Sequence, residues 1–137
     1  MTTATGARRN WRTGSPWEDA VGYSRVVRVG DHVRVAGTGA VRDGAVVGLG
    51  DLYTQTRTVL SIIEESLAQV DATIADVVLT RVYLTDITRW PDYARAHREV
   101  FDAVRPVTTA IEVPALIDPG MLVEIEAEAF CVRRPPG

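Results

Sequence analysis

Few side chains in this sequence could take part in acid–base or nucleophilic chemistry, and the most regular group is a row of glutamates. They alternate with apolar residues in the segment M-L-V-E-I-E-A-E-A-F-C near the C-terminus and are Glu124, Glu126 and Glu128. In a strand, this alternation puts the three carboxylates on one face of the sheet. Carboxylates in a row need water, cations or a partner, so this face is predicted to be either a solvated surface or a subunit interface.

The remaining candidates are two histidines and one cysteine. His32 follows a turn and His97 falls on the apolar stripe of a predicted helix, so both are interpreted as structural residues rather than general bases. Cys131 has no second cysteine to pair with and is interpreted as a buried structural thiol. Two histidines and one cysteine do not favour a multi-ligand zinc site. All 15 basic residues are arginines, which excludes a lysine Schiff base and a P-loop lysine.

The bulk composition sets the class of protein. The chain has 137 residues, 46% of them hydrophobic, which suits one compact domain. Its formal net charge of −3 gives no electrostatic case for nucleic acid binding. No apolar run approaches the roughly 20 residues of a membrane helix, and the N-terminus does not read as a signal peptide. A soluble cytoplasmic protein is therefore expected.

Hydrophobic periodicity predicts the elements that must position these residues. Residues 1–15 are polar and are expected to form a flexible N-terminal arm; residues 16–134 form the single domain, and residues 135–137 a tail. Asp51 is a plausible N-cap for the first helix, and Pro91 fits the first turn of the second. The predicted helices are Leu52–Gln69 and Trp90–Val104, and the predicted strands are Arg25–Val29, His32–Ala36, a short one at Val46–Val47, Val77–Leu84, Arg105–Val113 and Met121–Cys131.

Two amphipathic helices and one main sheet indicate an α+β fold in which both helices pack on the same face of a mixed β-sheet. The charged face of the last strand is then the uncovered face. Arg25, Arg34 and Arg81 lie in other predicted strands and could face the glutamates, depending on the strand register.

Several segments closely resemble the RidA/YjgF family, which is also called UK114 or L-PSP. The resemblance extends over nearly all of residues 20–134. The segments that carry it are V-R-V-G-D-H-V-R-V-A-G, T-R-V-Y-L-T-D-I-T-R-W-P-D-Y, P-V-T-T-A-I-E-V-P-A-L and V-E-I-E-A-E-A. The order and spacing of the last two near the C-terminus are fairly specific to the family.

The resemblance implies a chorismate-mutase-like fold and a homotrimer with a central β-barrel and small-molecule clefts between neighbouring chains. The best-understood members are deaminases: they hydrolyse enamines and imines to a keto acid and ammonia, without metal or cofactor. Some relatives are described as ribonucleases or translation inhibitors, which the acidic charge and missing lysines do not favour here.

The family's site residues transfer to this sequence only in part. The resemblance implies that Glu124 places the attacking water and that Tyr23 and Gly37 orient the ligand. The family's arginine, which grips the substrate carboxylate, is replaced by Thr108. Arg105 is not expected to compensate, because its offset within a strand turns it to the opposite face. A changed pocket for a neutral or phenolic ligand is therefore predicted, since threonine cannot form the bidentate grip of arginine.

Three alternatives stay open. Thr108 and Thr109 either donate hydrogen bonds to the ligand or serve only as strand formers. Trp17 either lines the mouth of the pocket or anchors the N-terminal arm on the domain. The protein itself is either an imine or enamine hydrolase with a non-standard substrate, or a non-catalytic trimer that binds metabolites or partners, since loss of the arginine leaves no second catalytic set.

Overall fold

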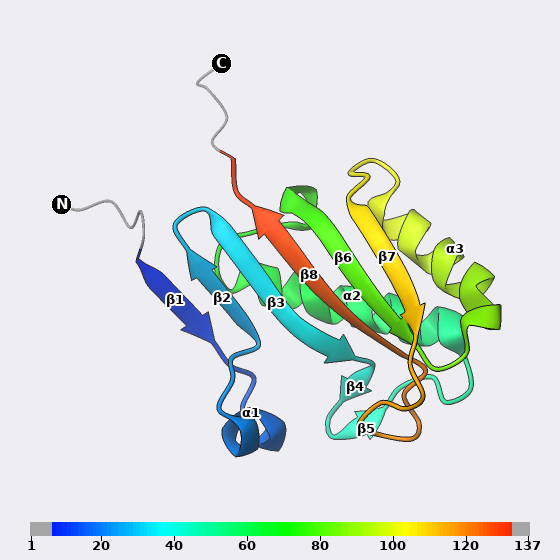
Figure 1. The fold of residues 1–137 in the computed structure, drawn as a ribbon. Coiled ribbons are helices and arrows are strands. Elements are labelled where there is room, and N and C mark those ends of the chain that lie inside the picture. Colours follow the sequence, from blue (N-terminus) through cyan, green and yellow to red (C-terminus); the bar gives the residue numbers. More distant parts are fainter. Residues whose placement is uncertain (1–6, 133–137) are drawn as a thin grey trace.

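The computed structural model describes residues 7–132, which form one mixed sheet with helices behind it (Figure 1). Within this range the main sheet has six strands in the order β1–β2–β3–β8–β6–β7. The strands are β1 Arg8–Trp11, β2 Val26–Val29, β3 His32–Gly39, β6 Val77–Leu84, β7 Val107–Glu112 and β8 Val123–Phe130; a separate hairpin is formed by β4 Val41–Arg42 and β5 Ala45–Val46.

Strands β6 and β7 are parallel, and all other neighbours in the sheet are antiparallel. The helices are α1 Pro16–Val21, α2 Leu52–Ala68 and α3 Trp90–Phe101, with short 3₁₀ turns at Ile74–Asp76 and Ile87–Arg89. The predicted α+β class and the chorismate-mutase-like arrangement, with α2 and α3 on one face of a mixed sheet, are confirmed.

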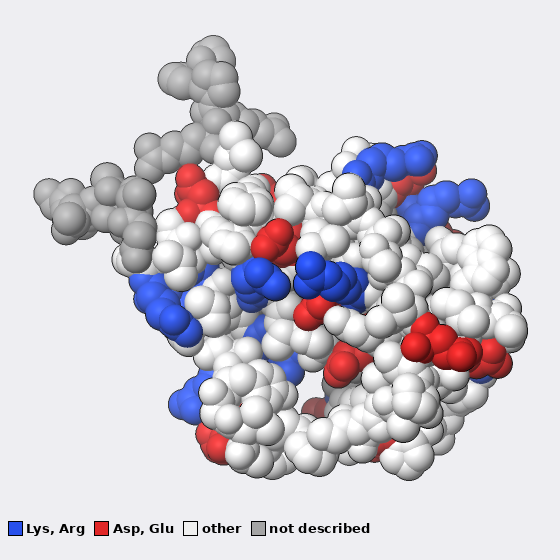
Figure 2. Space-filling model, viewed as in Figure 1, with Lys and Arg blue, Asp and Glu red and all other residues white. Residues whose placement is uncertain are grey.

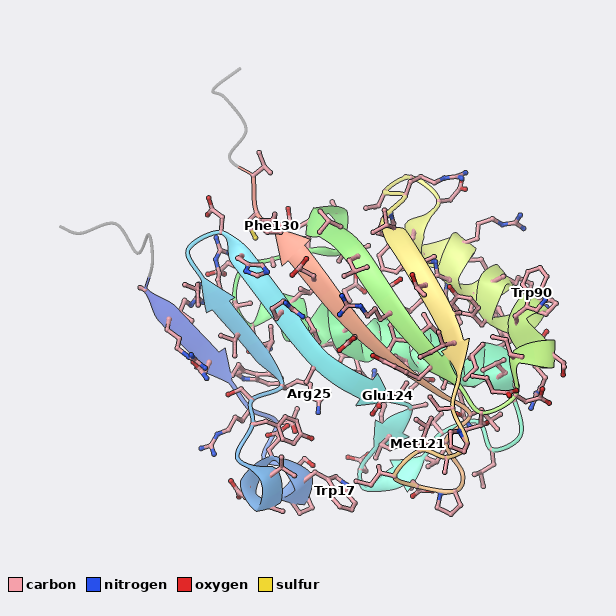
Figure 3. The ribbon with its side chains drawn as sticks, viewed as in Figure 1. Trp17, Arg25, Trp90, Met121, Glu124 and Phe130 are labelled. Atoms are coloured by element: carbon pink, nitrogen blue, oxygen red, sulfur yellow. The ribbon has the colours of Figure 1, made fainter. Side chains whose placement is uncertain are left out.

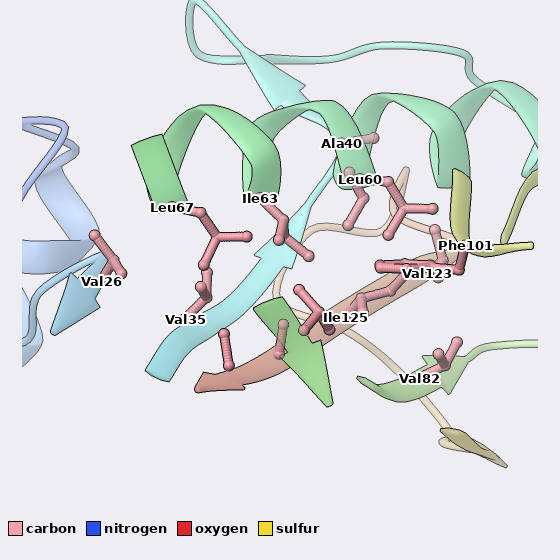
Figure 4. Packing of buried hydrophobic residues seen from close by; sticks show 14 of the residues in the cluster. Val26, Val35, Ala40, Leu60, Ile63, Leu67, Val82, Phe101, Val123 and Ile125 are labelled. Carbon is pink, nitrogen blue, oxygen red and sulfur yellow. The ribbon is translucent and has the colours of Figure 1, made fainter. Parts of the chain in front are cut away.

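Helix α2 begins where the sequence predicts. Asp51 accepts a hydrogen bond of 3.0 Å from the backbone N–H of Thr54, which satisfies one of the free donors of the first turn. The apolar stripe of α2 is buried against β3 and β8, where it meets the apolar row of β8 (Figure 4). Val123 and Ile125 are fully buried in this core, because the alternation of β8 directs them to the helices.

The uncovered face carries the charged side chains of the strands (Figure 2). The register places Arg34 opposite Glu128 and Arg81 opposite Glu126. The corresponding ion pairs measure 3.1 and 3.2 Å. These two predicted partners of the glutamates are confirmed. The third, Arg25, precedes β2 and is buried beside Glu124, but it forms no ion pair within 4 Å with a glutamate of β8 among the described residues.

The N-terminal region differs most from the sequence expectation. Residues 8–11, inside the predicted arm, pair with β2 as the edge strand β1. Helix α1 was also not predicted, although Ser15 caps it, Pro16 opens it and Gly22 ends it in the left-handed region at φ 84°. Residues 1–6 of the arm and the predicted tail 135–137 lie outside the described residues, and the division into arm, domain and tail stays a prediction.

Several boundaries also shift. Strand β3 continues to Gly39, so part of the predicted glycine-rich connection is sheet. Helix α3 ends at Phe101 rather than at Val104, and β7 begins only at Val107. Among the described residues, no helix is long and apolar enough to span a membrane.

Candidate functional site

A cavity of about 450 Å³ opens at the lower end of the sheet, between α1, the end of β3, the start of β8 and the loop before β8. Four of the six predicted site residues line it: Trp17, Tyr23, Gly37 and Glu124. Figure 3 shows Trp17 on one side, Met121 on the other, and Arg25 and Glu124 at its inner end. The hollow is visible in the space-filling view (Figure 2). We call it the Glu124 cavity.

Glu124 is the one carboxylate among the described residues that line this cavity. It lies on the charged face of β8, but unlike Glu126 and Glu128 it forms no ion pair within 4 Å among residues 7–132. Burial raises the pKa of its carboxyl group, the positive charge of Arg25 opposes that rise, and Glu126 adds to it. A half-buried carboxylate with a raised pKa is suited to accept and return a proton.

Gly37 makes room for that carboxylate. The pairing of β3 with β8 shifts between Val35 and Thr38, where β3 carries one extra residue. A Cβ atom on Gly37 would lie 3.0 Å from the carboxyl carbon of Glu124 and 3.3 Å from its Oε2. The absence of a side chain at Gly37 therefore allows Glu124 its place beside this bulge.

Arg25 also lines the cavity, although the sequence analysis named it only as a residue that could face the glutamates. Its side chain is buried, and one terminal nitrogen donates to the carbonyl oxygen of Gly37 at 2.8 Å and to Oγ1 of Thr38 at 2.9 Å. The other terminal nitrogen donates to the hydroxyl of Tyr23 at 3.2 Å. Arg25 thus ties Tyr23 to the bulge beside Glu124, so its bonds fix the inner end of the cavity.

A buried carboxylate stands behind Arg25. Glu18 in α1 is only 1% exposed and lies 3.8 Å from Nε of Arg25. The hydroxyl of Thr13 donates to it at 2.7 Å and the backbone N–H of Gly14 at 3.2 Å. Glu18 therefore compensates the buried charge of Arg25, as a buried guanidinium requires.

The outer wall of the cavity is apolar. Trp17 of α1 lines it, and so do Leu116, Ile117 and Met121 from the loop before β8. Trp17 is 49% exposed and Ile117 61% exposed. Trp17 therefore lies at the mouth of the cavity, which agrees with one of the two alternatives, while Met121 is buried at the far side.

Thr108 and Thr109 do not reach the Glu124 cavity within one chain. Thr108 points to the helix side, where Oγ1 of Thr80 donates to its hydroxyl at 2.7 Å and the hydroxyl of Tyr93 lies 3.1 Å away. Thr109 lies opposite Arg81 in the register of β6 and β7. The two threonines therefore face opposite sides of the sheet, as the alternation predicts.

Thr108 belongs to a second hollow of about 340 Å³, formed by α3 and the start of β7; we call it the Thr108 hollow. His97 lies there, 2.9 Å from Oγ1 of Thr80. Because the single hydroxyl proton of Thr80 goes to Thr108, Nε2 of His97 must be the donor in this contact. Burial lowers the pKa of His97 to about 4, so it is neutral near pH 7 and serves as a core residue.

Arg105 also lines the Thr108 hollow, contrary to the expectation that it faces away. It lies before β7 with a left-handed φ of 58°, so strand alternation does not apply to it. Its guanidinium donates to the side chain of Asp102 at 2.7 Å and to the backbone oxygen of Asp102 at 2.8 Å. Arg105 therefore lies near Thr108, which replaces the family's arginine, but the guanidinium of Arg105 is bonded to Asp102.

Comparison with known proteins finds a matching family and several relatives. A family model described as Endoribonuclease L-PSP matches residues 15–131. An uncharacterised protein of Streptomyces coelicolor is 42% identical over 124 residues, which cover 90% of this chain and 92% of that protein. A 3-aminoacrylate deaminase, RutC, of Acinetobacter baylyi is 32% identical over 84 residues, covering 61% of this chain and 66% of the relative.

Solved structures agree. A crystal structure from Mycobacterium tuberculosis, titled as a member of the YjgF/YER057c/UK114 family, is 50% identical with a TM-score of 0.84, covering 91% of this chain and all of that one. A putative endoribonuclease from Thermotoga maritima has a TM-score of 0.78 at 23% identity and covers 96% of both chains, which shows the same fold.

Proposed function

This chain belongs to the endoribonuclease L-PSP family, the YjgF/RidA family of the sequence analysis, and on that premise we propose that it is a cofactor-independent hydrolase of imines or enamines. One relative that shares about a third of its residues over the aligned region carries the name of a 3-aminoacrylate deaminase, which is an enamine-hydrolysing activity. The replacement of the family's arginine by Thr108 points to a substrate other than the standard 2-imino acids.

The observation that carries this proposal is Glu124. It is the unpaired, half-buried carboxylate of a cavity large enough for a small molecule, and its pKa is raised by burial. The bulge at Gly37 leaves it free to face the cavity, and the bonds of Arg25 hold the surrounding backbone. A carboxylate in this setting can take a proton from water at the moment of attack.

The proposed reaction needs only water and this carboxylate. A water oxygen forms a bond to the carbon of the C=N group, the π pair moves to nitrogen, and Glu124 accepts one proton of the water. Glu124 then returns that proton to the nitrogen of the tetrahedral intermediate. The hydroxyl group of this intermediate then passes its proton to the amino nitrogen by way of Glu124, the C=O bond forms and ammonia leaves, so an imine and a water give a carbonyl compound and ammonia.

We further propose that the site is completed in a homotrimer, in which the Thr108 hollow of one chain adjoins the Glu124 cavity of the next. Strand β7 is an edge strand of the described sheet, and its apolar residues Val107 and Ile111 are exposed in the single chain. Exposed apolar side chains on an edge strand favour pairing with another chain. Light scattering should give three times the chain mass of 14.9 kDa; a monomer mass would contradict the shared site.

A matched pair of variants tests the chemistry. Glu124→Gln removes the proton acceptor with little change in shape, whereas Glu128→Gln changes a carboxylate of the same strand face that is paired with Arg34. With imines generated in situ, Glu124→Gln should lower ammonia release by a factor of about 10² to 10⁴, and Glu128→Gln should not. Equal turnover by Glu124→Gln and the parent protein would sink the proposed hydrolase.

The second candidate is a non-catalytic trimer that binds a metabolite. It is favoured because Thr108 replaces the family's carboxylate-binding arginine, and because the hydroxyl of Thr108 is already bonded to Thr80 and Tyr93. Calorimetry that finds tight ligand binding without turnover would support it. A ribonuclease is less favoured, because the arginines of the uncovered face alternate with glutamates rather than forming a basic surface; RNA binding that weakens steeply with salt would reveal one.

A further inference from the structure

The charges of the Glu124 cavity restrict which reacting group it can accept; this inference rests on the proposed hydrolase. The cavity contains one guanidinium, that of Arg25, but this guanidinium is already occupied. One terminal nitrogen donates twice, to Gly37 and Thr38, the other donates to Tyr23, and Nε faces Glu18. The terminal nitrogen that donates twice keeps no free N–H, so the edge between the two terminal nitrogens cannot hold a carboxylate in a bidentate grip, and the edge with Nε faces Glu18.

The charge of Arg25 is also balanced. Glu18 lies within 4 Å of it and is buried, so the two form a neutral pair at the inner end of the cavity. Glu124 remains as the charge without a partner in this cavity. A second anion beside it would raise its pKa further and add repulsion, whereas a cation would keep it ionised.

The rest of the wall offers no charge. Trp17, Leu116, Ile117 and Met121 form its outer part, and Val21 and Val41 extend it. Such a wall favours an apolar or aromatic substituent, since burying apolar surface is favourable and burying an unpaired anion is costly.

We infer that the Glu124 cavity takes a cationic, carboxylate-free substrate: a protonated imine derived from a primary amine with an apolar or aromatic side group. The iminium group pairs with Glu124 and the side group packs on the wall formed by Trp17 and Ile117. Glu124 then accepts the proton of the attacking water, and the products are an aldehyde or ketone and ammonium.

A rival arrangement lies in the Thr108 hollow, which adjoins this cavity in the proposed trimer. Arg98 and Arg105 line the hollow, and Arg105 is bonded to Asp102. If either guanidinium group reached into the shared site, it would attract a carboxylate. The two arrangements therefore predict opposite preferences for imines that differ only in that group.

The test uses a pair of imines that differ only in the carboxylate. An amine oxidase acting on 2-phenylethylamine supplies the carboxylate-free imine, and an amino-acid oxidase acting on phenylalanine supplies the carboxylated one. Catalase removes peroxide, and semicarbazide traps whatever imine escapes hydrolysis. The purified full-length protein should lower semicarbazone formation from both imines, but at different protein concentrations. The concentration needed for the amine-derived imine should be roughly tenfold to hundredfold lower than that needed for the phenylalanine-derived imine, which is the range for one charged hydrogen bond.

Each other outcome counts against the inference. If the phenylalanine-derived imine is hydrolysed equally well or better, the protein is a hydrolase but the inference is overturned, and Arg98→Ala should then remove that activity. If neither imine is hydrolysed, the proposed function fails; if tryptophan fluorescence also shows no binding of 2-phenylethylamine, the inference fails with it. Thr108→Arg adds the missing guanidinium and should raise turnover of the carboxylated imine relative to the parent protein.

Discussion

The uncovered sheet face and the Glu124 cavity use the same residue types to opposite effect. On the face, Arg34 and Arg81 meet glutamates in register, and all four side chains are partly exposed. In the cavity, Arg25 is buried with Glu18, and Glu124 has no partner. Exposed pairs contribute little because water screens them, whereas buried charges depend on every partner they have. The comparison teaches that burial, rather than the number of charges, marks the candidate site.

The largest expected effect separates the two arginine environments. Arg25→Met leaves Glu18 buried without its cation, which typically costs about 3–5 kcal/mol of folding free energy. Arg81→Met breaks an exposed pair and should cost less than about 1 kcal/mol. Urea denaturation followed by circular dichroism measures both. Equal losses of folding free energy in the two variants would show that the buried and the exposed arginine do not differ as stated.

The Thr108 hollow sharpens the comparison, because a neutral histidine is buried in its wall, whereas its ion pair of Arg105 and Asp102 is exposed. The pKa of His97 is lowered to about 4 by burial, from an unfolded value near 6.5. The unfolded chain therefore binds more protons between these values, and stability is lost as the pH falls through this window, by up to about 3 kcal/mol. His97→Gln should flatten this part of the stability curve between about pH 6.5 and pH 4. If the slope of stability against pH is unchanged in this variant, groups other than His97 control the pH dependence of stability.

A smaller effect tests the space that Gly37 gives to Glu124. Gly37→Ala puts a Cβ atom 3.0 Å from the Glu124 carboxyl carbon and should displace it, lowering kcat by about tenfold or more. Gly39→Ala is the matched control, because its Cβ meets the flexible end of Met121 instead. The role of Gly37 is supported if Gly37→Ala lowers kcat by more than its loss of folded protein explains, while Gly39→Ala does not. Similar kcat values in the two glycine variants would speak against the special role of the bulge.

Much of the fold could be predicted from periodicity. The strand Val77–Leu84 has the predicted bounds, and α2 begins at the residue that follows the predicted cap. Strand β1 was missed because R-R-N-W is polar and lies at the sheet edge, where pairing with β2 decides its conformation. Helix α1 was missed although its Ser-Pro start is a known signal, because six residues give no apolar period.

The candidate site could be predicted only in part. The resemblance identified Glu124, Tyr23 and Gly37, and these three line one cavity. Arg25 could not be found this way, because its burial depends on α1 and on a bulge that no sequence pattern marks. The distance of Thr108 from Glu124 also depends on the strand order, and whether a second chain joins their surroundings stays a prediction.

The titration of the Glu124 carboxyl group tests the central claim most directly, because the account depends on a buried, unpaired acid beside Arg25. Carbon-13 NMR of side-chain carboxyl groups should give Glu124 a pKa above that of an ordinary glutamate, as burial requires, and Arg25→Gln should raise it further. An ordinary pKa for Glu124, insensitive to Arg25, would contradict the account.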